Sequence, residues 1–133
     1  MTCKGLWFAA FIISLACTSC ATIDDTAEED RTLTFDCNDI VVIGRLNNNR
    51  DYEHVEIDGD ILGHGWMTGA ISVHRPVAGP AVEKKVPVRY FGHTYLREDR
   101  TFMFVLSPTD DGIYHLSDQR LMSDQPRPTS ECN

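Results

Sequence analysis

The sequence predicts an all-β domain, a small closed barrel or sandwich, that follows an export signal. Two short runs of β-branched and aromatic residues, Ile40–Ile43 and Phe102–Leu106, are typical of strands buried on both faces. Turn-forming residues recur at intervals of about 8 to 12 positions between the apolar runs, the spacing of short strands in barrels and sandwiches. No stretch shows a convincing helical period, so at most one short helix is expected, between Leu116 and Met122.

The first 20 residues have the pattern of a signal peptide. Lys4 gives a basic start, and the apolar run Leu6–Ala16 follows it. A membrane-spanning helix needs roughly 20 apolar residues, so this run is too short to span and suits a secretory signal. We therefore predict export to the periplasm or the outer membrane of a bacterial envelope, or secretion.

The end of the signal permits two kinds of processing. Small residues before Cys20 resemble a lipoprotein box, and Cys17 is an alternative position for the same modification. Neither has the usual aliphatic residue three positions earlier. Ordinary cleavage after Ala21 would leave an unlipidated protein. We expect lipidation at Cys20, which would make this protein a lipid-anchored envelope protein.

The following segment, residues 21–32, is acidic and almost free of large apolar side chains. Such a segment cannot bury enough surface to offset the entropy lost on ordering, so it is predicted to be a flexible tether. The folded domain is then residues 33–133, which is large enough for one modest core.

The charge of the chain limits its partners. The formal net charge is −8, and removal of Lys4 with the signal would make it −9. An acidic surface disfavours nucleic acid, whose phosphates require basic side chains. It also disfavours electrostatic adhesion to anionic lipids, so membrane attachment would come through the lipid anchor only.

The predicted domain contains two cysteines, Cys37 and Cys132. Cysteines exported to an oxidising compartment usually pair, and this bridge would close nearly the whole domain. The alternative is that Cys132 is a free thiol on the C-terminal tail.

The first half of the domain alternates between strand and turn patterns. The strand through Ile40–Ile43 is followed by an Asn-rich loop, and apolar and polar residues then alternate from His54 to Ile61. That alternation predicts a half-buried strand, interrupted or turned at Asp58-Gly59. A further strand is predicted over Trp66–His74, with Met67, Ile71 and Val73 on one face.

The second half continues in the same way. Residues 76–80 are predicted to form a turn, and Val86–Phe91 the next strand, whose proline suggests an edge or first-residue position. The buried strand Thr101–Leu106 leads through a turn at Pro108–Gly112 into Ile113–Leu116.

Three segments resemble the netrin-like domain of tissue inhibitors of metalloproteinases. They are Phe35–Ile43, with Cys37-Asn38 ahead of an aliphatic run, Thr68–Gly79, and Phe104–Leu106 followed by Asp111–Leu116. The resemblance implies a five-stranded OB-fold barrel and a disulfide from Cys37 to Cys132. The inhibitory Cys-x-Cys start of that family is missing, because this chain has Cys17-Thr18-Ser19-Cys20 far from the first strand.

These patterns favour a non-enzymatic binding module whose partner is an unknown envelope protein or small ligand. Trp66, Tyr90 and Tyr95, together with Phe91, are candidates for a binding surface, because OB-folds present aromatic platforms to ligands. Packing in the core or at the barrel rim is the default alternative for these side chains. A protease inhibitor of the metalloproteinase-inhibitor type is the first alternative function.

A small metal-dependent hydrolase is the second alternative function. His54, Glu56, Asp58 and Asp60 alternate along one predicted strand and could present imidazole and carboxylate ligands, although a solvated strand face explains the same pattern. No catalytic motif and no cysteine pair at metal spacing is present. We therefore expect no enzyme activity, no catalytic residue, no metal site and no cofactor.

Overall fold

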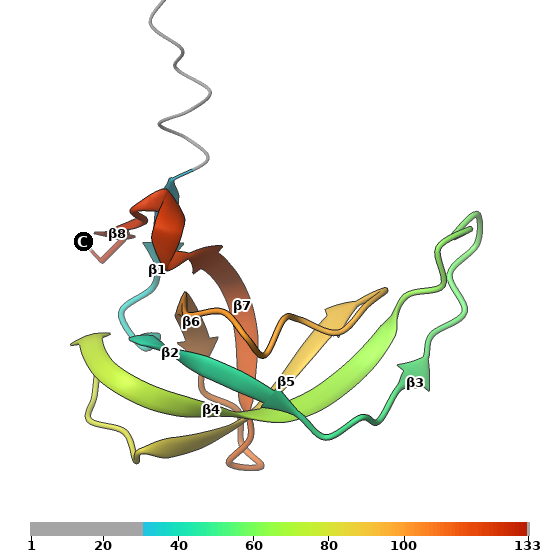
Figure 1. Ribbon diagram of the computed structural model, residues 1–133, viewed down its shortest axis with the longest axis horizontal. Coiled ribbons are helices and arrows are strands. Elements are labelled where there is room, and N and C mark those ends of the chain that lie inside the picture. The colour runs from blue at the N-terminus through green and yellow to red at the C-terminus, as the bar shows by residue number, and fades with distance from the viewer. Residues whose placement is uncertain (1–30, 133) are drawn as a thin grey trace, which may run out of the picture.

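The computed structural model describes residues 31–132, which form a closed barrel of five strands (Figure 1). The barrel strands are β2 (Ile40–Asn48), β4 (Gly65–Ala78), β5 (Lys85–Gly92), β6 (Phe102–Ser107) and β7 (Tyr114–Leu121). They are hydrogen-bonded in the order β2-β6-β7-β5-β4, and β4 pairs again with β2 to close the barrel. The prediction of an all-β, small closed barrel is confirmed.

The barrel is mixed, because only one of its five pairings is parallel. Val88 and Arg89 of β5 pair in parallel with Tyr114 and His115 of β7, whereas all other neighbours in the barrel are antiparallel. This order, with a short parallel contact between the third and fifth barrel strands, is compatible with an OB-fold.

The interior of the barrel is filled by the residues that the sequence pattern marks as apolar. Along β5, Val86, Val88 and Tyr90 alternate with exposed residues, as a strand with one buried face requires. In contrast, the first five residues of β2 and of β6 are all buried, as their continuous apolar runs predict.

Both faces of these two strands are buried because a second layer covers them. The barrel core includes Val42, Leu46 and Phe104. The opposite face of the same strands forms a smaller cluster in which Val41 and Val105 contact Leu33, and Leu33 is fully buried.

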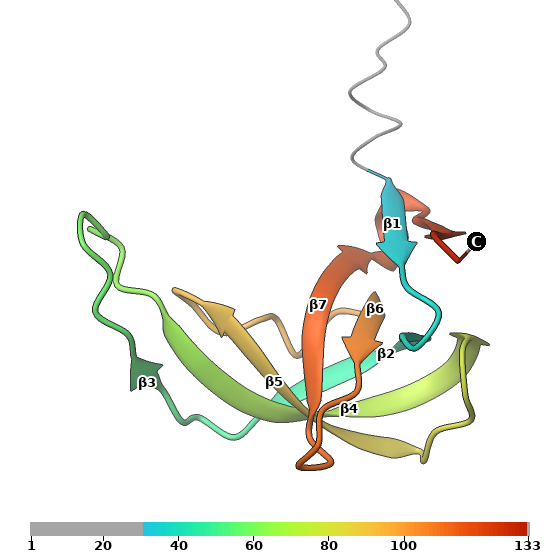
Figure 2. The same cartoon turned by 180° about the vertical axis from the view of Figure 1, so that it is seen from behind.

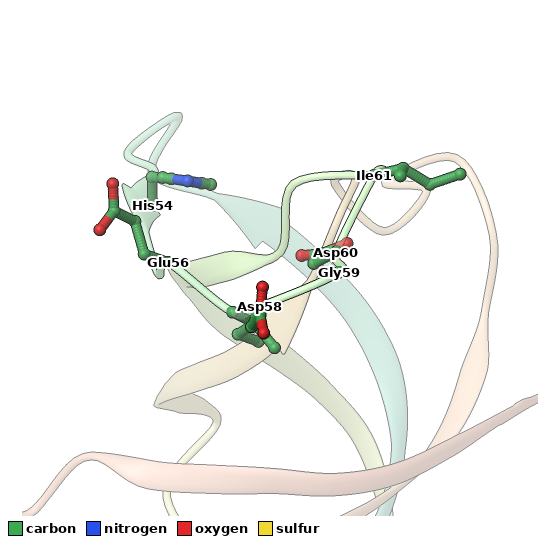
Figure 3. Close-up of a pocket in the computed structure, with 7 residues that line it drawn as sticks. His54, Glu56, Asp58, Gly59, Asp60 and Ile61 are labelled. Carbon is green, nitrogen blue, oxygen red and sulfur yellow. The ribbon is translucent and has the colours of Figure 1, made fainter.

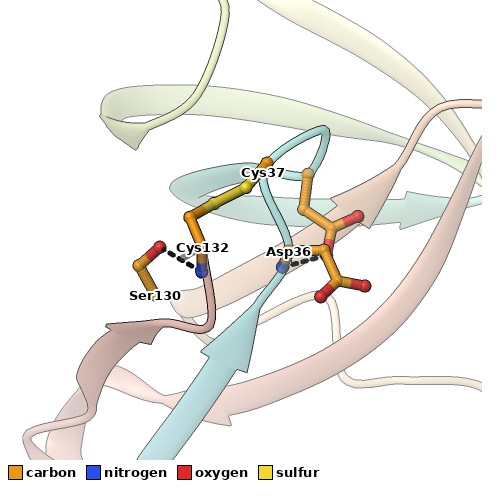
Figure 4. Close-up of a disulfide and its surroundings, with 5 residues drawn as sticks. Asp36, Cys37, Ser130 and Cys132 are labelled. Atoms are coloured by element: carbon orange, nitrogen blue, oxygen red, sulfur yellow. Dashed lines mark hydrogen bonds between the residues drawn. A yellow bond between two sulfur atoms is a disulfide. The ribbon is translucent and has the colours of Figure 1, made fainter.

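This second layer is a two-stranded parallel sheet outside the barrel. It consists of β1 (Thr32–Phe35) and β8 (Arg127–Ser130), and β8 follows the 3-10 helix η1 (Met122–Asp124) (Figure 2). A disulfide joins Cys37, just after β1, to Cys132, just after β8, with the Cα atoms 5.2 Å apart (Figure 4). The predicted pairing of these two cysteines is confirmed.

Closure of the barrel depends on irregularities between β2 and β4. The register shifts between Val41 and Val42 and again between Ile43 and Gly44, which lets the long strand β4 bend around the barrel. A Cβ atom at Gly44 would lie 2.4 Å from the carbonyl oxygen of Ser72, so the close approach of the two strands requires glycine there.

Three local predictions differ from the structure. The alternation from His54 to Ile61 does not form a strand: only β3 (Glu53–His54) pairs with β4, and the following residues form a loop. Strand β4 continues through Pro76 to Ala78, so the predicted turn over residues 76–80 is confined to its end. Strand β7 extends to Leu121, and the short helix begins only at Met122.

Several predictions lie outside the described residues. They are the signal peptide of residues 1–20 and the lipidation at Cys20 or Cys17. The predicted tether of residues 21–32 also lies outside the described residues, except for its last two positions. Within residues 31–132, the structure contains no helix with the length and hydropathy needed to cross a membrane.

Candidate functional site

Outward-facing side chains of three barrel strands form an aromatic surface, here called the aromatic face. Its members are Trp66 of β4, Arg89 and Phe91 of β5, His115 of β7, and His64 and His93 from the adjoining loops. The strand pleat determines this placement: the neighbours Met67, Val88 and Tyr90 point into the core, so the alternate residues point outward.

Trp66 lies at the centre of the aromatic face. The Phe91 ring meets it edge-on at a centroid distance of 5.1 Å, and the His115 ring does so at 5.6 Å. The guanidinium carbon of Arg89 lies 4.8 Å from the centre of the Trp66 ring, a cation–π contact. Arg89 also forms an ion pair with Glu53 at 3.1 Å, and both of these side chains are exposed. The Trp66 ring therefore contacts Phe91, His115 and Arg89.

His64 connects the aromatic face to the loop before β4. Its ring stacks on Phe91 with a centroid distance of 5.6 Å and meets the His93 ring edge-on at 5.2 Å. The carboxylate of Asp60 lies 2.9 Å from His64 Nδ1, which fixes the orientation of the imidazole. Phe91 remains 40% exposed, so a ligand can reach the apolar part of the face.

The loop over residues 55–64, here called the arm, projects from one end of the barrel (Figures 1 and 2). Asp60 accepts hydrogen bonds from the backbone N–H groups of Leu62, Gly63 and His64, at 3.0, 3.1 and 2.6 Å. The hydroxyl of Tyr52 donates to the carbonyl of Gly63 at 2.5 Å. These bonds give the arm a defined shape although it belongs to no regular strand.

The arm carries apolar side chains in an acidic setting. Ile57, Ile61 and Leu62 are 47%, 95% and 62% exposed. A hollow of 630 Å³ lies beside this part of the chain (Figure 3). The hollow is lined by His54, Glu56, Ile57, Asp58, Gly59, Asp60 and Ile61. The row of polar residues considered as metal ligands therefore borders a wide, open hollow.

Asp60 makes the shape of the arm dependent on acidic pH. The backbone N–H of His64, and then its side chain, lower the Asp60 pKa from 3.8 to about 2. A lowered pKa in the folded state stabilises the fold above the unfolded pKa, and that contribution is lost as the pH falls through about 2. We expect the amide signals of Leu62, Gly63 and His64 to show no common transition near pH 4, where an ordinary carboxyl group titrates.

At lower pH these three amide signals should move together with a midpoint near 2, and Asp60→Asn should remove this transition. NMR titration measures both. A midpoint at or above 3.8 would contradict the account of the arm.

The aromatic residues considered as a binding surface do not all lie on one face: Trp66 and Phe91 are together, whereas Tyr90 and Tyr95 lie elsewhere. Trp66 is at the centre of the aromatic face, but Tyr90 is buried, and its hydroxyl donates to Asn48 Oδ1 at 2.5 Å. Burial raises the Tyr90 pKa. The hydroxyl of Tyr95 donates to the carbonyl of Asp51 at 2.9 Å, and its ring lies 5.5 Å from the Arg50 guanidinium carbon. Neither Tyr90 nor Tyr95 therefore belongs to the aromatic face, which contains Trp66 and Phe91.

Sequence reasoning named Phe91 together with Trp66 but missed Arg89, His93 and His115 as members of the aromatic face. The sequence contains a signal for part of this set. Val86, Val88 and Tyr90 are alternate residues on the buried side of β5. Arg89 and Phe91, which lie between and after them, must therefore point to the opposite side. The placement of His115 follows from the short parallel pairing of β5 with β7, which local sequence does not encode.

The chemistry available on the aromatic face is that of recognition. It offers aromatic rings for stacking, one guanidinium and three imidazoles for hydrogen bonds. In residues 31–132, no group of three or more histidine, cysteine or acidic side chains is arranged to hold a metal ion.

Comparisons with protein-family models, with curated proteins and with solved structures found no match to this chain. The evidence for the barrel and for the disulfide is therefore the structure itself.

Proposed function

We propose that this protein is a non-enzymatic binding module of the bacterial cell envelope, and that the aromatic face is its binding surface. The observation that carries the proposal is the packed set of Trp66, Phe91 and Arg89 on the outer side of β4 and β5. Binding sites of OB-folds lie on this side of the corresponding second and third strands of the barrel. The ligand is an envelope protein or a small molecule.

Physical reasons support this use of the aromatic face. Aromatic and arginine side chains contribute a large share of the energy at protein interfaces, because they bury much surface and keep polar groups for hydrogen bonds. Here the Trp66 ring already contacts Phe91, His115 and Arg89, so part of the side-chain ordering that binding requires is present in the free protein.

Export and lipid anchoring belong to the same proposal. They rest on the signal pattern of residues 1–20 and on Cys20, with Cys17 as the alternative. The disulfide between Cys37 and Cys132 is in keeping with an oxidising compartment. The netrin-like resemblance supports a role as an interaction module. An acylated Cys20 would have no free amine for the zinc-chelating chemistry of metalloproteinase inhibitors.

Two variants of the aromatic face test the proposal against a matched control. Arg89→Glu reverses a charge on the face, and Phe91→Ser removes an exposed ring. Arg75→Glu makes the same charge change at an exposed position of β4 outside the face. Each protein is expressed in its native envelope with an affinity tag, and the proteins that co-purify are quantified by mass spectrometry.

We expect a partner whose recovery falls at least tenfold with Arg89→Glu and with Phe91→Ser, but stays unchanged with Arg75→Glu. Equal recovery with all four proteins would contradict the use of the aromatic face, and so would an equal loss with Arg75→Glu.

A further inference from the structure

The arm presents an apolar group that the rest of its own chain leaves uncovered. Ile61 and Leu62 are 95% and 62% exposed. The backbone beneath them is fixed by hydrogen bonds that the Asp60 carboxylate accepts and that the Tyr52 hydroxyl donates. A fixed, exposed apolar group is typical of an interaction site, because its burial by a partner is favourable and the backbone loses little conformational entropy on binding.

The charges around this group select the kind of partner. Glu56 and Asp58 are exposed on the arm, and no arginine or lysine occurs between Asp51 and Met67. Among the described residues, neither carboxylate has an ion-pair partner within 4.0 Å. A surface that receives the arm should therefore be a pocket that offers apolar side chains for Ile61 and Leu62 and basic side chains for the two carboxylates.

The same chain contains such a pocket at the turn between β4 and β5, here called the turn pocket. It has a volume of 340 Å³, and apolar side chains line it together with polar groups, which make up the larger part of its surface. The lining residues are Ala81, Val82, Glu83, Lys85, Val86, Pro87, Gly112 and Tyr114. Lys85 lies at the pocket and Lys84 is the preceding residue; both are exposed and, within residues 31–132, have no ion-pair partner. They are the only lysines of the domain, and Glu83 is the only acidic residue that lines the pocket.

The arm cannot reach the turn pocket of its own chain. The two features adjoin opposite ends of β4, which begins at Gly65 next to the arm and ends at Ala78 before the turn. Fourteen strand residues correspond to roughly 45 Å along the strand. Figures 1 and 2 both show the arm and the β4–β5 turn on opposite sides of the barrel.

We propose that the arm of one copy of this chain docks into the turn pocket of a second copy. Ile61 and Leu62 enter the turn pocket against its apolar side chains, and Glu56 and Asp58 pair with Lys84 and Lys85. Because the two surfaces differ and lie at opposite ends, the contact is head-to-tail and leads to rings or open chains rather than to a two-fold dimer.

Sedimentation velocity of the purified domain over a range of concentrations tests this proposal. We expect association that increases with concentration and weakens at high salt. The double variants Ile61→Ser/Leu62→Ser and Lys84→Glu/Lys85→Glu should each weaken it at least tenfold. Arg75→Glu should leave it unchanged. All these side chains are exposed, and circular dichroism with a thermal melt verifies that each variant is folded.

A mixing experiment distinguishes head-to-tail docking from other kinds of association. The arm variant keeps an intact turn pocket, and the lysine variant keeps an intact arm, so an equimolar mixture should form one-to-one dimers and nothing larger. The proposal is overturned if the wild type stays monomeric at millimolar concentration, or if the mixture does not associate. It is likewise overturned if association survives in both double variants. A wild-type protein that stays monomeric and binds another protein through the arm would also overturn it.

Discussion

Replacing Cys37 and Cys132 together with serine should lower the free energy of unfolding by about 4 kcal/mol. The bridge spans 95 residues and so restricts nearly the whole unfolded domain; in the chain-entropy model, long loops give the largest gain. Chemical denaturation of wild type, reduced wild type and the double variant measures the loss. The reduced wild type serves as the control for the substitutions themselves, and should unfold like the double variant.

Part of this loss should be local to the β1–β8 sheet. All four residues of β8 are exposed, so this strand is held mainly by its pairing with β1 and by the disulfide. The amide of Glu131, which donates to the carbonyl of Phe35 at 3.0 Å, should exchange much faster with solvent after reduction. An unfolding free energy within about 1 kcal/mol of wild type, with unchanged exchange at Glu131, would contradict this role of the bridge.

Phe104→Ala should destabilise the barrel by about 3–5 kcal/mol. Phe104 is fully buried on β6 in the barrel core, where it pairs with Val42 of β2. Its removal leaves a cavity that the closed barrel cannot readily collapse, because five strands hold the backbone around it.

Phe91→Ala is the matched control, since it makes the same chemical change at a ring that is 40% exposed. It should cost less than about 1 kcal/mol. Similar losses at positions 91 and 104, measured by urea denaturation, would be inconsistent with the described core.

The barrel core was predictable because its sequence signals are local. The continuous apolar runs in β2 and β6 predict strands buried on both faces, and Met67 and Ile71 correctly indicate the inner face of β4. The small sheet of β1 and β8 was not predicted. Its strands are four residues long and pair in parallel across almost the entire domain, and β8 has no buried face.

The arm shows why an alternating pattern can mislead. Residues His54 to Ile61 alternate as a half-buried strand does, but beyond His54 no sheet surface covers the apolar side, and Ile57 and Ile61 remain exposed. The Asp60 carboxylate instead accepts hydrogen bonds from backbone N–H groups that a strand would have used in its ladder. Local side-chain bonds therefore decide the conformation of this segment.

The candidate site was only partly predictable for a related reason. Trp66 was identified by its residue type. Tyr90 points into the core because it lies on the same side of β5 as Val86 and Val88. His115 comes close to Trp66 only through the parallel pairing of β5 with β7, which forms between distant parts of the chain.

The central claim is that the aromatic face is a binding surface, and photo-crosslinking in the native envelope tests it most directly. A photoreactive phenylalanine analogue is placed at position 91, on the face, and at position 75, which is exposed on β4 outside it. We predict a discrete crosslinked product from position 91 that disappears when Arg89→Glu is added, and none from position 75. Equal products from both positions, or no product from position 91, would contradict the claim.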